Sequence, residues 1–174
     1  MKVTKIIVRA GLVAALYAVL TLLFAFSSFS TAIVQFRISE ALTILPLFFP
    51  EAIVGLWVGC MLGNIYTGNV IDIFFGSGAT LIAASLTFLT GMLVRRPMPR
   101  IVLGAIPPVL VNALLVPLTY TVFIGEPALY WLQALFVLAG QAAVIAVIGV
   151  PFAYALSKRY YRPKEALWKR EKQS

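Results

Sequence analysis

The chain has 174 residues, of which 61% are hydrophobic and 11% charged, and its formal net charge is +8. Charged residues make up about a quarter of an ordinary soluble domain, so this composition, with a mean hydropathy of +0.98, indicates a protein that lies in a lipid bilayer. The sequence has no histidine and one cysteine, Cys60. An internal disulfide is therefore excluded, and so are metal and acid–base sites that depend on imidazole.

The hydropathy pattern predicts an all-α, polytopic membrane protein, a single domain over residues 1–174 with six helices in a transmembrane bundle. Turns with Pro, Gly or charged residues, such as Pro50-Glu51, separate the apolar blocks. The second and third blocks are shorter than the ~20 residues of a standard span, so we expect neighbouring helices to shield them from lipid. The predicted helices cover residues 5–27, 37–49, 51–66, 71–95, 101–124 and 128–157, and residues 158–174 form a basic cytoplasmic tail.

With six helices, all but one of the fourteen Lys and Arg residues fall at one end of the bundle, and Arg37 is the exception. Basic residues in short loops of membrane proteins face the cytoplasm. We therefore expect both termini in the cytoplasm, and the segments with Arg37, Asp72 and Glu126 outside. Because the positive charge follows membrane topology, we expect the lipid bilayer and not nucleic acid as its partner.

The candidate substrate-binding residues map to the outer half of the predicted bundle. Arg37 and Glu40 are three residues apart, so they share one face if the stretch is helical, and they lie between apolar blocks, where a charge is costly without a function. Two interpretations stay open: Arg37 neutralises Glu40, or carboxylate and amide groups contact the edge of a flat polar ring held between aromatic faces. The candidates are Glu40, Arg37, Asn64, Asp72, Asn112, Gln141, Tyr120 and Trp131. For the loop carboxylates and the aromatics, helix caps and an interfacial belt are the competing interpretation.

The first apolar block carries small residues at four-residue spacing, Ala10, Ala14 and Ala18. Such a stripe lets another helix backbone come close. It serves either packing inside the bundle or docking of a partner helix. We interpret a second stripe, Gly76, Thr80 and Ala84, as internal packing.

The string Gln-Phe-Arg-Ile-Ser-Glu-Ala-Leu at residues 35–42, with Asn64 and the Asp-Ile-Phe-Phe-Gly-Ser string at 72–77, resembles the queuosine-precursor transporter family. These proteins are the QueT-type substrate-binding (S) components of energy-coupling factor (ECF) transporters. The resemblance implies an S-component bundle in a bacterial cell membrane that captures a 7-deazaguanine base outside for ATP-driven uptake. It also implies a transmembrane coupling subunit, docked on the Ala10/Ala14/Ala18 stripe, and two cytoplasmic ATPases as partners.

A deazaguanine presents a ring N–H beside an amino group, and one carboxylate accepts both in a bidentate contact. We hypothesise that Glu40 is this carboxylate, with Asp72 as the second choice, while a ring carbonyl suits Arg37 or the amides.

Alternatives remain. An S component for another vitamin or small nutrient has the same fold, and a cargo-free membrane assembly subunit needs none of the outer polar residues. An intramembrane enzyme lacks a nucleophile–base pair here, so we expect no catalytic residues, no metal and no cofactor.

Overall fold

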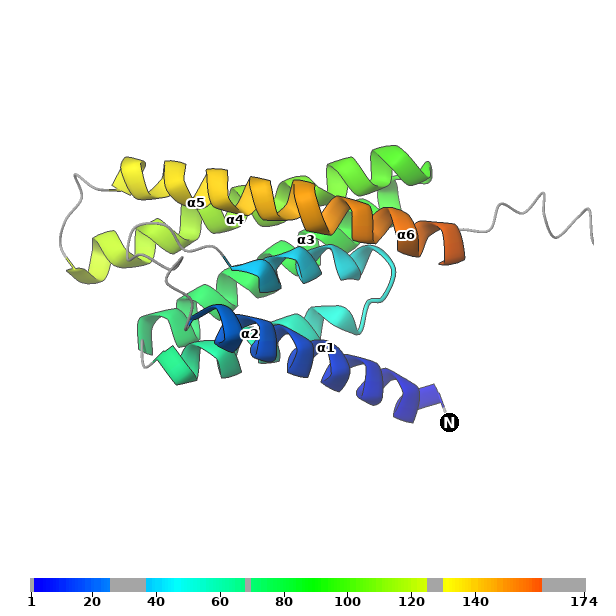
Figure 1. Cartoon of the computed structure of the whole chain (residues 1–174), viewed down its shortest axis with the longest axis horizontal. Helices are drawn as coiled ribbons and strands as arrows, with labels where there is room; N and C mark the ends of the chain where they lie inside the picture. Colours follow the sequence, from blue (N-terminus) through cyan, green and yellow to red (C-terminus); the bar gives the residue numbers. More distant parts are fainter. Residues whose placement is uncertain (1, 26–36, 68–69, 125–129, 161–174) are drawn as a thin grey trace, which may run out of the picture.

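The computed structural model describes residues 2–25, 37–67, 70–124 and 130–160, and within these residues the chain is a bundle of helices (Figure 1). The elements are, in order, α1 (Lys2–Ala25), η1 (Ile38–Leu47), α2 (Ala52–Thr67), η2 (Asp72–Gly76), α3 (Ser77–Leu93), α4 (Pro97–Ile124), α5 (Tyr130–Val144), η4 (Ile145–Gly149) and α6 (Val150–Tyr160). η1 is a 3-10 helix, whereas η2 and η4 are single π-helical turns. The predicted all-α membrane bundle is confirmed.

Within the described ranges, four helical paths are long and apolar enough to cross a bilayer, namely Val3–Leu23, Asp72–Leu93, Pro97–Leu118 and Tyr130–Tyr160. Ile38–Leu47 and Ala52–Tyr66 are shorter apolar helices at the second and third predicted blocks. The last path joins α5, η4 and α6 into one helical run past the predicted end at residue 157. α4 also continues through its three internal prolines, which membrane helices tolerate when neighbours satisfy the freed backbone groups.

The short helix η1 lies at the centre of the bundle. Every residue from Ser39 to Leu47 is buried, and η1 contacts α1, α2, α3, α4, α5, η4 and α6. Figure 1 shows it, in cyan, between α1 and the α5–α6 run. A helix that is apolar nearly all round belongs in a core, and this burial is how a segment too short to span the bilayer is shielded from lipid.

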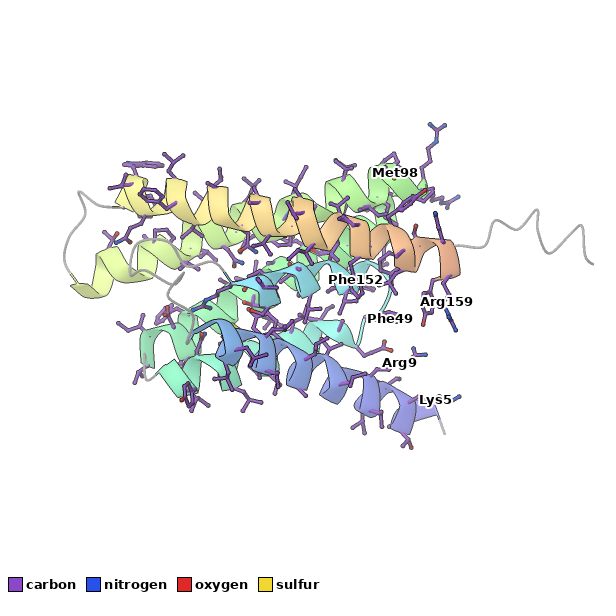
Figure 2. The ribbon with its side chains drawn as sticks, in the orientation of Figure 1. Lys5, Arg9, Phe49, Met98, Phe152 and Arg159 are labelled. Carbon is purple, nitrogen blue, oxygen red and sulfur yellow. The ribbon has the colours of Figure 1, made fainter. Side chains whose placement is uncertain are left out.

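The basic side chains gather at one end of the bundle. Figure 2 shows Lys5, Arg9 and Arg159 at the same end. There Arg9 forms an ion pair with Glu51 at 3.0 Å. Arg37 directly precedes the first residue of η1. The ten residues of η1 are about 20 Å long at the ~2 Å rise per residue of a 3-10 helix, so Arg37 lies about that far from the Leu47 end. The separation of Arg37 from the remaining described cations therefore matches the charge pattern read from the sequence.

Helix α1 packs on α2 through three glycines at four-residue spacing, Gly55, Gly59 and Gly63. A Cβ atom at Gly55 would lie 2.6 Å from the carbonyl oxygen of Ala10, and one at Gly59 would lie 2.7 Å from that of Ala14. Only a hydrogen atom fits in these positions. Ala14 is accordingly 7% exposed, so the alanine stripe of α1 serves packing inside the bundle at this residue.

Replacing Gly59 with alanine tests this contact. We expect Gly59→Ala to destabilise the protein by about 1–3 kcal/mol, because the added methyl group overpacks the α1–α2 contact. Gly11→Ala is the matched control, since nothing lies within 4 Å of a Cβ at Gly11 and alanine favours a helix over glycine by about 1 kcal/mol. Thermal melts in detergent should show a lower melting temperature for Gly59→Ala only; equal melting temperatures would contradict the close approach.

Candidate functional site

A buried polar cluster is centred on Glu40, whose residue surface is 3% exposed. Its Oε1 atom accepts a hydrogen bond from the hydroxyl of Tyr17. Its Oε2 atom accepts one from the side-chain amide of Asn112 at 3.1 Å and one from that of Gln141 at 3.0 Å. The donors come from α1, α4 and α5, so three helices converge on one residue of η1.

The pattern of α1 explains why Tyr17 reaches this cluster. Ala14, Tyr17 and Thr21 follow one another at three- and four-residue spacing, which places them on one face of a helix, and all three are buried. Thr21 lies one turn beyond Tyr17, and its hydroxyl is 2.9 Å from the hydroxyl of Ser39. Two successive turns of α1 are therefore hydrogen-bonded to the first turn of η1.

Arg37 does not form an ion pair with Glu40. Among the residues that the structure describes, no cationic group lies within 4 Å of Glu40, and Arg37 pairs instead with Asp72 at 4.0 Å. The reason lies in the backbone: Arg37 is the N-cap residue of η1, with φ −95° and ψ 96°. That extended conformation takes its side chain off the helical face on which the three-residue spacing would have placed it.

Glu40, Arg37 and Asp72 share a small cavity. Its volume is about 30 Å³, and the described residues that line it are Arg37, Glu40, Asp72, Gly76, Thr80, Asn112, Val116, Val137 and Gln141. That volume holds about two water molecules, so a two-ring ligand fits only when the walls separate. Of the predicted candidates, Arg37, Glu40, Asp72, Asn112 and Gln141 are brought together here.

Asn64 lies beside the cavity without being among its lining residues. It is fully buried, and its side-chain amide donates to the carbonyl oxygen of Asp72 at 2.7 Å. A Cβ atom at Gly76 would approach the same amide nitrogen to 3.4 Å, so a glycine at that position leaves room for it. Asn64 thus holds the start of η2, from which Asp72 reaches the cavity.

The structure does not bring Trp131 to this cavity. Trp131 is 74% exposed and meets Tyr130 edge-on, with 5.0 Å between the ring centroids. It precedes Gln141 by ten residues on α5, which is about 15 Å along a helix. The side chain of Tyr120 lies outside the described residues.

Sequence reasoning missed several residues of the cluster. Gly76 and Thr80 line the cavity, although their spacing was interpreted as a packing stripe. Tyr17 was not a candidate at all. The signal that would have found it is a hydroxyl in the middle of an apolar block, on the same helix face as Ala14, because a buried tyrosine hydroxyl usually has a hydrogen-bond partner.

Apolar helical segments around a buried polar cavity define a multi-pass membrane protein with a polar cavity inside its bundle. The chain matches the family model of the QueT transporter over residues 7–158 and therefore belongs to the QueT transporter family. The queuosine precursor transporter QueT of Lactococcus lactis subsp. cremoris (strain MG1363) is 36% identical to it over 80 residues. That alignment spans 46% of this chain and 47% of the relative, slightly less than half of each. No solved structure matches the chain.

Proposed function

We propose that this protein is the substrate-binding component of an ECF-type importer and captures a queuosine precursor, a 7-deazaguanine base, at the outer face of the cell membrane. The observation that carries the proposal is the buried carboxylate of Glu40, which faces a cavity and whose hydrogen-bond donors, among the described residues, are neutral. Membership of the QueT transporter family and the name of the Lactococcus relative support the choice of cargo. Binding rather than catalysis is the assigned role, because the family is one of transporters.

The hydrogen bonds of Glu40 fit a ligand with two adjacent N–H donors. A carboxylate has about four acceptor positions, two on each oxygen, and donors in the described part of the chain fill three of those on Glu40. Oε1 keeps one position, whereas Oε2 is filled by Asn112 and Gln141. A base that donates to both oxygens therefore replaces one amide, and the displaced amide is free to meet the ring edge.

The remaining cavity residues suit the rest of such a base. Arg37 supplies donors for a ring carbonyl, and Val116 and Val137 supply apolar wall. Two carboxylates and one guanidinium line the described cavity, so an aminomethyl precursor, which is cationic, is favoured over a neutral one. Asp72 is the second choice for the carboxylate that contacts the base.

For the coupling subunit we propose a groove between α1 and α2 of about 380 Å³. Ala10, Gly11 and Ala14 lie in its lining with Gly55, and such small residues allow another helix to approach. Ala18 is half-buried and lies outside the groove lining. We therefore favour Ala10 and Ala14 as the residues of the stripe that contact the coupling subunit. The two ATPases would join through the coupling subunit.

Glu40→Gln tests the binding role. Glutamine keeps the shape but replaces one acceptor with a donor, so a bidentate contact is lost. We expect the Kd of the aminomethyl 7-deazaguanine, measured by isothermal titration calorimetry on the purified protein, to rise about tenfold to a hundredfold.

Asp72→Asn is the comparison that separates the two carboxylates. We expect a smaller rise in Kd for Asp72→Asn than for Glu40→Gln. The opposite order would assign the contact to Asp72, and unchanged affinity in both variants would remove the carboxylates from the site.

Orientation in the membrane can be tested by cysteine labelling. The single native cysteine, Cys60, is buried, so the wild-type protein gives the background level of labelling. Val70 and Met98 are 63% and 52% exposed, and they belong to the predicted outer and inner ends. We expect a membrane-impermeant maleimide to label Val70→Cys on intact cells and Met98→Cys only after the membrane is opened. Labelling of Met98→Cys alone on intact cells would reverse the proposed orientation.

Gly11→Trp tests the docking groove. Because a Cβ at Gly11 has open space around it, we expect folding and ligand affinity to stay as in the wild type. Co-purification with the coupling subunit, and with it uptake, should weaken about tenfold or more, as for a blocked interface centre. Leu135→Trp on α5, where Leu135 is 61% exposed, is the matched control. An equal loss in both variants would count against the groove.

A further inference from the structure

Tyr17 touches Glu40 but is not among the residues that line the cavity. It is completely buried, in a core cluster with Leu42, Leu45 and Leu56. We propose that Tyr17 is a positioning residue of the substrate site, which fixes the plane of the Glu40 carboxylate so that both oxygens are offered to a ligand. This inference rests on the proposed function, and it adds a residue that never touches the substrate.

The distribution of donors over the two carboxylate oxygens is the first support. Asn112 and Gln141 both donate to Oε2. Within the described part of the chain, the donor to Oε1 is Tyr17. The terminal torsion of a glutamate has no sharp rotamer preference, so two donors on one oxygen leave the other oxygen able to swing. A donor on each oxygen fixes the plane.

The anchoring of Tyr17 is the second support. A donor positions its acceptor only when it is itself fixed, and Tyr17 has no exposed surface. One turn further along α1, Thr21 lies 2.9 Å from Ser39, hydroxyl to hydroxyl. The packing of Tyr17 in the core cluster, rather than this second α1–η1 link, holds the phenol in place, so it cannot follow a rotating carboxylate.

The consequence is selectivity rather than affinity alone. A base with a ring N–H and an adjacent amino group uses both oxygens of Glu40, whereas an analogue without the amino group uses one. A carboxylate held in a fixed plane strengthens the binding of the first ligand more than that of the second. Tyr17 therefore contributes to the ratio of the two dissociation constants, which a general loss of packing would leave unchanged.

The test measures the Kd of the aminomethyl 7-deazaguanine and of its analogue without the exocyclic amino group. It compares the wild type, Tyr17→Phe and Thr21→Val. Phenylalanine keeps the ring that fills the core and removes the hydroxyl. We expect Tyr17→Phe to reduce the preference for the two-donor base about tenfold, mainly by raising the Kd of that base.

Thr21→Val is the matched control, because it removes the neighbouring α1–η1 hydrogen bond without touching Glu40. We expect it to lower the melting temperature of the ligand-free protein and to keep the wild-type preference. An unchanged preference in Tyr17→Phe, or an equal fall in both variants, would overturn the inference while the proposed function stands. The wild-type measurement tests the proposed function by itself, since a wild type without preference for the two-donor base contradicts the bidentate contact.

Discussion

The structure depends on a carboxylate placed in the middle of an apolar bundle. Burying an ionised group is very costly unless its hydrogen bonds are made inside the protein, and Glu40 makes them with neutral groups from three helices. That requirement brings α1, α4 and α5 to the same point on η1, so the core and the candidate site are one arrangement. A cation beside Glu40 would also have compensated the burial of its charge, and fewer helices would then have had to supply donors. Arg37 is instead drawn to Asp72, which leaves the acceptor positions of Glu40 to groups that can exchange.

Much of the candidate site was predictable, because a polar residue inside an apolar block is costly unless it has a structural or functional role. That principle selected Glu40, Asn112 and Gln141 from three separate segments, and the fold brings them within hydrogen-bond distance. It could not predict which group each of these side chains contacts. The ion pair of Arg37 follows from an extended N-cap residue, which residue spacing cannot show. Trp131 has the chemistry for stacking on a ring, but its place in the first turn of α5 leaves it 74% exposed, and only the packed structure determines that.

The alanine stripe on α1 shows the same limit in another form. Four-residue spacing of small residues predicts close packing, but the partner is decided by the facing surface. Here the glycines of α2 leave room for α1 backbone at Ala10 and Ala14, so one side of the stripe is used inside the bundle. The other side opens into the groove with Gly11. Because Tyr17 extends the buried face of this helix to Glu40, α1 belongs both to the candidate substrate site and to the proposed docking surface.

These contacts fall into those that a ligand at Glu40 would leave in place and those that it would replace. α1, η1 and α2 are joined by glycine contacts and by the hydrogen bonds of Tyr17 and Thr21, none of which a ligand at Glu40 has to break. The amides of Asn112 and Gln141 occupy the acceptor positions that the proposed ligand would take, and they belong to α4 and α5. Under the proposed function, a cavity sized for two waters must widen for a two-ring base, and we expect the α4–α5 side to yield. Since one internal hydrogen bond is exchanged for one from the ligand, the number of hydrogen bonds changes little. Affinity must then come mainly from the second, charge-assisted contact and from apolar ring surface removed from water.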